Sequence, residues 1–482
     1  MKMAKINTTL TRKIICWIIL ILCFASCAIR QTYKRPARSI DSLYRNASST
    51  EATRNATDVT RTATDTTTIA DIPWNAMFSD TVLQGLIREG LSNNYDVKAS
   101  IARIEQAQAS FRQSKAAFYP TLSANAQAAY QSLSISQGGA LSQSNQSYQL
   151  GGSSSWEVDI WGKLKGAKKA ALANLLASDA SKRAVQTELI ASIATNYYNL
   201  LSLDKQVAIT MQTVEVRKED VETNKALKEG AKVTSAAIMQ SEANRYAAEV
   251  LLPDLLNNIR QTENAICVLL GRHPGLIKRT TLDAQVPYGS LQTGIPAQLL
   301  SNRPDVQAAE FNLRFYFEQT NIARAYFYPT LTITAAGGWQ NTSVSELFNA
   351  VSLFGNIIGG LTQPIFNQGL NRQRLEIAKA QYDENLAVFQ KTVLSAGQEV
   401  SDALYSYQSA LDKENIRVKQ LSFLQKSVDY TRELLKYGYA TYTDVLTSEQ
   451  NLLTTQLSGI NDKLQELTAV VTLYRSLGGG WK

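Results

Sequence analysis

The five residues FYPTL occur twice in this chain, as Phe118–Leu122 and as Phe327–Leu331. The second copy begins 209 residues after the first (327 − 118), and similar text surrounds both. Proline lacks the N–H that a helix interior or a central strand would use, so Pro120 and Pro329 each indicate a boundary between two elements. A boundary that recurs at such a distance predicts an internal duplication.

Side chains that alternate in polarity follow both prolines, and this period of two is typical of β-strands. Two such segments follow Pro120 and two follow Pro329, with a polar loop inside each pair. We therefore expect two strand hairpins, each beginning where a helix ends. Their apolar or small positions are Leu122, Ala124, Ala126, Ala128 and Tyr130, then Tyr148, Leu150, Gly152, Ser154, Trp156, Val158 and Ile160, and in the second copy Leu331, Ile333, Ala335, Gly337 and Trp339, then Val351, Leu353, Gly355, Ile357, Gly359 and Leu361.

Two long stretches without proline favour helices of unusual length. No proline lies between Pro120 and Pro253, and none follows Pro364. Within these gaps, residues 162–230 and 368–438 carry helix-forming residues nearly throughout. At a rise of about 1.5 Å per residue, each would be on the order of 100 Å long if continuous, several times the width of a globular domain.

Each long helix is expected to turn at a glycine, Gly230 or Gly438, and to return as the second arm of a helical hairpin. Pro253 should break the first return arm, because its ring clashes with the preceding turn. Apolar residues of the second return arm mostly step by three and four, which indicates coiled packing. Leu203–Lys205 recurs as Leu411–Lys413. The predicted unit is thus about 208 residues of helix, strand hairpin and helical hairpin, used twice.

The N-terminus has the pattern of an export signal. Four cations within the first thirteen residues precede an apolar run that ends at Cys27 and is too short to span a bilayer comfortably. Phe24–Cys27 is similar to a lipobox, in which small residues precede a cysteine that becomes lipidated. We expect residues 1–26 to be a lipoprotein signal peptide and Cys27 to carry lipid. Cys23 follows a bulky leucine and fits less well, and an ordinary signal peptide is the alternative.

Composition constrains the chain beyond the signal. Residues 27–72, rich in Thr and Ser, are expected to form a lipid-anchored tether, residues 73–285 the first repeat, and residues 286–482 the second repeat with the C-terminal tail. Without the four signal cations, the net charge falls from +8 to +4, so nucleic-acid binding has little support. If Cys27 carries lipid, Cys267 is the one cysteine left, and no intramolecular disulfide is expected.

Four strands of about ten residues match the length that crosses an outer membrane. Four strands cannot close a barrel, whose usual minimum is about eight, and open edges in lipid leave backbone groups unpaired. The sequence therefore predicts that several copies share one barrel. Periodicity alone fits equally well a water-soluble four-stranded sheet packed on helices. The export signal, the duplication and the overlong helices favour the membrane.

Motifs spread along the chain carry a resemblance to a known family. They are Tyr33–Pro36, Asn94–Asp96, Arg103–Ala107, both FYPTL copies, Trp156–Gly162, Leu300–Val306 with Ala309–Glu310, Gln363–Phe366 and Leu477–Trp481. On these residues, the chain resembles the TolC-like outer-membrane efflux proteins, in the nodulation-type lipoprotein branch associated with RND efflux. The resemblance covers essentially the whole chain after the signal, apart from the Thr-rich segment, and the Arg303–Asp305 stretch is its most specific part.

The resemblance implies a mixed α+β membrane protein. It implies a homotrimer in the outer membrane of a Gram-negative bacterium, whose twelve strands, four from each copy, form one barrel continued by an α-helical periplasmic tunnel. Family members dock onto a periplasmic adaptor protein and an inner-membrane RND-type pump. Such a channel is an exit duct that conducts substrates passively and performs no chemistry. Channels of this kind carry drugs, metal ions, dyes or polypeptides, and the pump or adaptor selects among them.

The resemblance also implies a gate at the hairpin tips, where inward-facing aspartates narrow the periplasmic end. Asp444, six residues after Gly438, matches one such position, whereas Thr447 stands where the family has its next acid. Three copies of Asp444 around an axis would concentrate negative potential. Helix capping is the alternative role, because Thr441–Asp444 has the spacing of a capping box.

Other function classes have weaker support. No set of nucleophile, base and orienting residue indicates an enzyme, and His273, the one histidine, gives no sign of a metal or cofactor. Gly478–Gly480 lacks the remaining residues of a phosphate-binding loop and is expected to be a frayed end. The alternative function is a periplasmic adaptor or a coiled-hairpin structural lipoprotein of an export complex. An adaptor would carry one helical hairpin, whereas this sequence predicts two.

Overall fold

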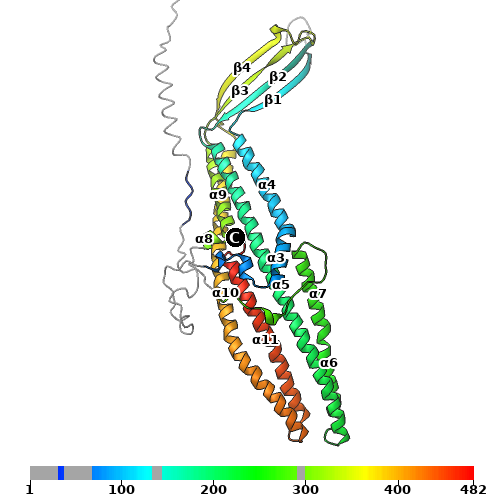
Figure 1. Ribbon diagram of the computed structural model, residues 1–482. Helices are drawn as coiled ribbons and strands as arrows, with labels where there is room; N and C mark the ends of the chain where they lie inside the picture. The colour runs from blue at the N-terminus through cyan, green and yellow to red at the C-terminus, as the bar shows by residue number, and fades with distance from the viewer. Residues whose placement is uncertain (1–30, 37–67, 133–143, 290–298) are drawn as a thin grey trace, which may run out of the picture. The chain divides into compact units, whose positions relative to one another are not determined.

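The computed structural model describes residues 31–36, 68–132, 144–289 and 299–482 (Figure 1). The chain divides into two compact units, each of which draws on both sequence repeats. We call the first the sheet unit; its described residues are 31–36, 104–178 and 309–389. We call the second the helical unit; its described residues are 68–103, 179–308 and 390–482.

The described helices follow the predicted order. In the first half of the chain they are α3 (Thr81–Asn93), α4 (Tyr95–Ala116), α5 (Lys163–Glu229), α6 (Ser235–Glu249) and α7 (Leu251–Leu269), and in the second half α9 (Pro304–Ala325), α10 (Leu370–Lys436) and α11 (Tyr442–Ser476). Short elements are η1 (Ile69–Asp71), α2 (Trp74–Met77), η2 (Leu282–Ala284), α8 (Leu299–Asn302) and η4 (Ala350–Ser352). Among the described helices, none combines the length and apolar character needed to cross a membrane.

The two longest helices confirm the lengths predicted from the absence of proline, since α5 and α10 each contain 67 residues. α10 and α11 pack as an antiparallel hairpin. Arg417 donates to Asp462 at 2.8 Å, and Arg432, closer to the turn, donates to Glu449 at 2.9 Å. Polar pairs of this kind hold the two arms in one register.

The first return arm is interrupted, as predicted, but three residues before the proline. α6 ends at Glu249 and α7 begins at Leu251, with Val250 between them at φ −65° and ψ −17°. Pro253 therefore lies in the first turn of α7, where backbone N–H groups have no partner within the helix. The break precedes the proline because the ring would clash with the carbonyl four residues earlier.

The two hairpin ends turn with the same left-handed backbone but with different residues. Gly438 has a φ of 76° after α10, and Ala231 has a φ of 56° after α5. The first long helix ends where the chain was expected to turn, since α5 ends at Glu229 and the Gly230 N–H makes the last helical hydrogen bond, to the Ala226 carbonyl at 3.3 Å. Ala231, the next residue, adopts the left-handed backbone conformation, which its Cβ disfavours.

The described strands form one antiparallel sheet in chain order (Figure 1). Pro120 directly precedes the first strand and Pro329 the third. Each hairpin pairs its first residues with its last, and Val158 pairs with Leu331 between the hairpins. The strand ends that lead to α4, α5, α9 and α10 therefore lie at the same end of the sheet. The strands are β1 (Thr121–Ser132), β2 (Ser144–Val158), β3 (Thr330–Asn341) and β4 (Leu353–Thr362).

The register gives this sheet one apolar face and one polar face, because directly opposed residues of antiparallel strands point the same way. One row across the sheet reads Ala126, Leu150, Trp339 and Leu353, and the next row, on the other face, reads Gln127, Gln149 and Gln340. Large side chains of the apolar face are open to the surroundings, with Leu122 85% and Ile357 80% exposed. The predicted alternation is confirmed in β1, β2 and β3, whereas β4 also carries Phe354 and Ile358 on the otherwise polar face. Ile160 and Val351, expected in strands, lie outside them.

We expect Gly438→Ala to loosen the second hairpin end and Ala231→Gly to tighten the first, each by up to about 1 kcal/mol. A Cβ at Gly438 would meet no atom within 4 Å, so the variant reports the cost of the left-handed backbone alone. Amide hydrogen exchange at the two ends measures both changes. Gly230→Ala is the matched control, since its Cβ would meet its nearest atom at 3.6 Å. Equal exchange in the two glycine variants would contradict the assignment.

Candidate functional site

The end of the second hairpin is closed by a capping box, which confirms the capping role expected of Thr441–Asp444. The Asp444 N–H donates to Thr441 Oγ1 at 3.4 Å, and the Thr441 N–H donates to Asp444 Oδ2 at 2.8 Å. The Thr441 hydroxyl donates to the same carboxylate oxygen at 2.7 Å. These hydrogen bonds lower the pKa of the exposed Asp444 carboxyl. Asp444 is thus a charged group at the hairpin end.

The first hairpin end lacks this arrangement. Thr234 occupies the N-cap position of α6 but accepts no capping hydrogen bond from the described residues. Ala236 and Ala237 follow it, so the first turn of α6 carries no acid. At the second end, Thr447 donates its hydroxyl to the Thr443 carbonyl at 2.8 Å and supplies no charge.

Three helices of the helical unit meet at a buried charge cluster formed by Asp220 of α5, Arg432 of α10 and Glu449 of α11. Arg432 donates to Glu449 Oε1 through Nε at 2.9 Å and through Nη2 at 2.5 Å, and its Nη2 lies 3.4 Å from Asp220 Oδ1. The Glu449 and Asp220 side chains are only 8% and 15% exposed. Two buried carboxylates therefore share one guanidinium.

Burial and the neighbouring carboxylate of Glu449 shift the pKa of Asp220. Burial raises the pKa of Asp220 to about 7, the neighbouring Glu449 adds to the shift, and Arg432 and Arg217 oppose it. Asp220 Oδ2 and Glu449 Oε2 are buried and accept no hydrogen bond from the described residues. A proton on Asp220, donated to Glu449, satisfies both oxygens and removes the excess charge. Burial also raises the pKa of the adjacent Tyr442 to about 12.

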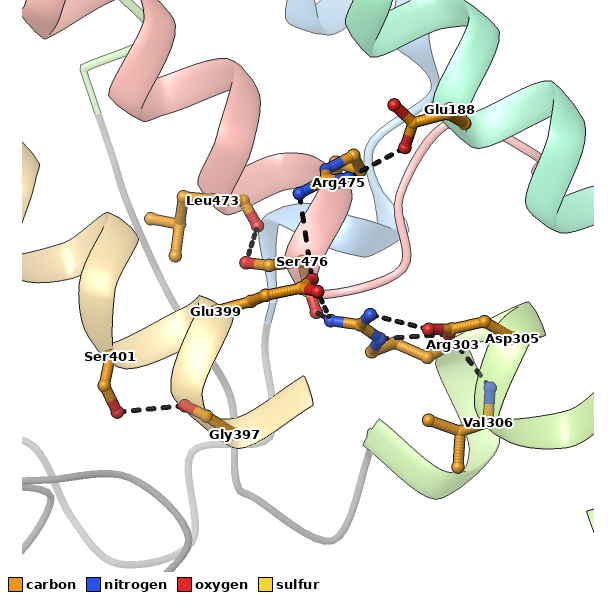
Figure 2. Close-up of polar contacts among 10 residues, drawn as sticks. All are labelled: Glu188, Arg303, Asp305, Val306, Gly397, Glu399, Ser401, Leu473, Arg475 and Ser476. Atoms are coloured by element: carbon orange, nitrogen blue, oxygen red, sulfur yellow. Dashed lines mark hydrogen bonds and ion pairs between the residues drawn. The ribbon is translucent and has the colours of Figure 1, made fainter. Parts of the chain in front are cut away.

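A second cluster is centred on Arg303, whose guanidinium is 8% exposed (Figure 2). Arg303 donates to both carboxylate oxygens of Asp305, at 3.0 and 2.7 Å, and its Nη1 donates to Glu399 and to the Ser476 carbonyl, both at 2.9 Å. Burial opposes the charge, but Asp305 and Glu399 outweigh it and raise the Arg303 pKa. Pro304 presets the first turn of α9. The cluster ties the start of α9 to α10 and α11.

Arg475 extends the Arg303 cluster to α5. It lies 2.8 Å from Glu188 and 3.8 Å from Glu399, and Figure 2 shows both carboxylates turned toward it. A cavity of about 490 Å³ adjoins these side chains, and Asp96 and Arg103 complete its charged lining. Four acids and three bases line this cavity, so it shows no strong preference for one sign of charge.

The C-terminal glycines are part of this packing, and the expectation of a frayed end at Gly478–Gly480 is wrong. All three glycines are buried. Gly478 has a φ of 88°, and a Cβ there would lie 2.5 Å from the Asn302 carbonyl oxygen. The Trp481 indole donates to the same oxygen at 3.0 Å. Close contact with the Asn302 backbone at Gly478 and with the Tyr474 ring at Gly479, rather than flexibility, explains these glycines.

In the part of the chain that the structure describes, no three His, Cys, Asp or Glu side chains gather in a group able to hold a metal ion. His273 follows α7 and is exposed. Sequence reasoning missed the Asp220 cluster and the partners of Arg303. The Arg303–Asp305 motif was the one available signal for the second, and nothing in the local sequence pointed to the first.

Comparison with known proteins places the chain in a family. The sequence pattern described as "Outer membrane efflux protein" matches residues 86–272 and 295–479. The chain is 27% identical to the cation efflux system protein CusC of an Escherichia coli O6:H1 strain, over 96% of this chain and 97% of that one. It is 29% identical to the probable efflux pump outer membrane protein TtgC of Pseudomonas putida, over 86% of each.

Solved structures agree with the fold. The outer-membrane channel OprN superposes with a TM-score of 0.83 at 22% identity, covering 94% of this chain and 99% of that one. The chain belongs to the outer membrane efflux protein family. It is therefore an outer-membrane efflux channel, and the periplasmic adaptor alternative is set aside.

We expect the contact between α5 and the α10/α11 hairpin to strengthen as the pH falls through about 7. The native pKa of Asp220 is raised, so the packed state binds the proton more tightly than the separated helices do, and the contact weakens as the pH rises. Hydrogen exchange of α5 amides near Asp220, at pH 5.5 and 8, measures this. Asp220→Asn should give slow exchange at both values, and Asp429→Asn, on an exposed face of α10, is the control. A wild type without pH dependence would contradict the expectation.

Proposed function

We propose that three copies of this chain assemble into one channel, with a shared twelve-stranded barrel in the outer membrane and a helical tunnel in the periplasm. In this proposal the channel is the passive exit duct of a tripartite efflux system. A periplasmic adaptor and an inner-membrane RND-type pump deliver substrates to it, and it catalyses no reaction. We further propose the boundaries 1–26 for the signal, 27–72 for the tether, and 73–285 and 286–482 for the two repeats.

The observation that carries this proposal is the two-faced sheet. An apolar face is stable against lipid and a polar face against water, which is the arrangement of a barrel with a water-filled lumen. Within the described residues, β1 and β4 pair with another strand on one side only. Lipid offers no hydrogen bonds to the open sides, so copies that pair β4 of one chain with β1 of the next supply the missing partners.

Lipid attachment at Cys27 is part of the proposal, although Cys27 lies outside the described residues. Support comes from Gln31–Pro36, which runs along α9. The Asn321 side chain exchanges hydrogen bonds of 3.3 and 3.1 Å with the backbone of Gln31, and Arg35 Nε donates to Glu310 at 2.8 Å. Four residues reach about 14 Å at most, so a lipid on Cys27 would stay near the end of α9 that leads to β3.

The proposed periplasmic gate uses Asp444 of the second hairpin end. Its carboxylate is exposed and held in one orientation by Thr441, so three copies facing one axis would form a ring of fixed negative charge. The first hairpin end adds no acid to such a ring in its first helical turn. Gly438 and Ala231 set the two turns, and Gly230 ends the first helical arm.

Crosslinking of the sheet edges tests the shared barrel. Cysteines at Leu122 in β1 and Ile357 in β4 lie in one row of the same face but about 14 Å apart within one copy, because three strand spacings separate them. A short thiol crosslinker should therefore join copies of the double-cysteine variant and give covalent dimers and trimers on denaturing gels. Each single-cysteine variant, the control, should give monomers or dimers but no covalent trimer. Monomers alone would refute the proposal. Mass spectrometry of the intact protein in the same sample measures whether the chain is cleaved before Cys27 and whether Cys27 is acylated.

Single-channel recordings test the gate with a matched pair of variants. Asp444→Asn removes the charge but keeps an oxygen that can accept from the Thr441 N–H. Thr441→Ala removes the capping hydroxyl but keeps the charge. We expect Asp444→Asn to raise conductance or weaken block by multivalent cations, and Thr441→Ala to leave the block in place. Unchanged recordings for Asp444→Asn would remove Asp444 from the gate.

A further inference from the structure

Exposed cations gather on the helix turns that adjoin the sheet, within the sheet unit. These turns belong to the end of α4 and the starts of α5 and α10, which meet the sheet at one end. We call this set the basic belt. Its members are Arg112, Lys115, Lys165, Lys168, Lys169, Arg372, Arg374 and Lys379, all exposed.

Few acids offset the basic belt. Glu376 lies 3.8 Å from Arg372 and is the one acid in residues 112–116, 163–169 and 370–379, and Glu318 of α9 lies 3.9 Å from Lys169. At the end of β2, Glu157 is paired with Lys163 at 2.6 Å, and Asp159 accepts from the Leu164 and Lys165 N–H groups at 2.9 and 2.8 Å. The belt therefore keeps a large positive excess.

Aromatic rings, rather than carboxylates, neighbour several of these cations. Lys115 lies 4.6 Å from the centre of the Phe111 ring, and Arg374 lies 4.6 Å from that of Tyr326. Such contacts orient a cation but leave its charge in place. The charge thus remains available to an outside anion.

Large apolar side chains are exposed in the links that join the strands to α4, α9 and α10. Tyr119 is 74% exposed, Phe327 43%, Ile365 99% and Phe366 86%. An aromatic and aliphatic rim beside cations is typical of a surface at the boundary between lipid tails and headgroups. The basic belt lies next to this rim along the chain, on the helix side.

The first hairpin end of the helical unit does not share this excess of exposed cations over acids. Residues 222–232 there carry Lys225, Lys228 and Lys232 together with Glu222 and Glu229, a mixture of both signs. Lys225 pairs with Glu222 at 2.8 Å. A generally basic composition therefore does not explain the belt.

We propose that the basic belt binds the phosphates of anionic phospholipids in the leaflet that adjoins the helix ends. Lysine and arginine form charge-assisted hydrogen bonds with phosphate, and a lipid with a net negative charge gains more from the belt than a zwitterionic one. The inference rests on the proposed barrel, which brings the strand ends and the apolar rim to the membrane surface. Three copies would surround the barrel with three such belts.

Native mass spectrometry of the full-length protein from nanodiscs of phosphatidylglycerol and phosphatidylethanolamine tests this. The wild type should retain phosphatidylglycerol above its share of the disc. The combined variant Lys165→Gln, Lys168→Gln, Arg372→Gln and Lys379→Gln should lose this enrichment, by on the order of fivefold for each cation that contacts a phosphate. The matched control replaces four exposed lysines of the helical unit, namely Lys218→Gln, Lys228→Gln, Lys232→Gln and Lys436→Gln, and should retain the wild-type enrichment.

Single-channel recordings on the same variants separate the possible failures. Trimers that conduct, with no enrichment in the wild type or with equal enrichment in the belt variant, overturn the lipid inference alone. A belt variant that keeps the enrichment but changes ion selectivity overturns it too, because the cations then face the lumen. A wild type that forms neither trimers nor pores overturns the proposed barrel and the lipid inference with it.

Discussion

Backbone groups inside a lipid bilayer must find hydrogen-bond partners within protein, and in the proposed barrel this requirement governs the sheet of this chain. Its alternating side chains suit lipid on one face and water on the other, but no choice of side chains satisfies an open strand edge. The partners have to come from further backbone. The proposed barrel therefore depends on self-association in a way that a sheet buried beneath helices does not.

The two charge clusters of the helical unit differ in how completely their polar atoms are paired. This difference distinguishes a cluster that only holds helices together from one whose protonation changes with pH. Arg303 has carboxylate or carbonyl partners on three of its nitrogens, in a geometry that fixes three helices. Around Arg432, buried oxygens of Asp220 and Glu449 have no donor among the described residues. The first cluster gains nothing from a proton, whereas the second does, so only the second converts a pH change near 7 into a change in packing.

Local sequence patterns were enough to predict the elements of this fold and not the contacts between them. The strand pairs follow from a period of two, and α5 and α10 follow from long stretches without proline, because both depend on near neighbours in sequence. The Asp220 cluster joins residues more than 200 positions apart, and the burial of Gly478 depends on Asn302. Neither of these long-range contacts can be recognised from the residues nearby in the sequence. The left-handed backbone of Ala231 was not predicted, because glycine is the residue that usually adopts it.

The two halves of the chain share one order of elements but differ in the rigidity of their hairpin ends. The second end has a glycine at its left-handed position and a capping box at the start of α11. The first end holds Ala231 in a left-handed conformation and starts α6 without a side-chain cap from the described residues, and its return arm is broken further along, at Val250. Each difference lowers the free energy needed to deform the first end. Because Asp220 of α5 contacts Arg432 of the second hairpin, the titratable cluster joins the more deformable arm to the stiffer one, and a protonation there acts on the arm that yields more easily.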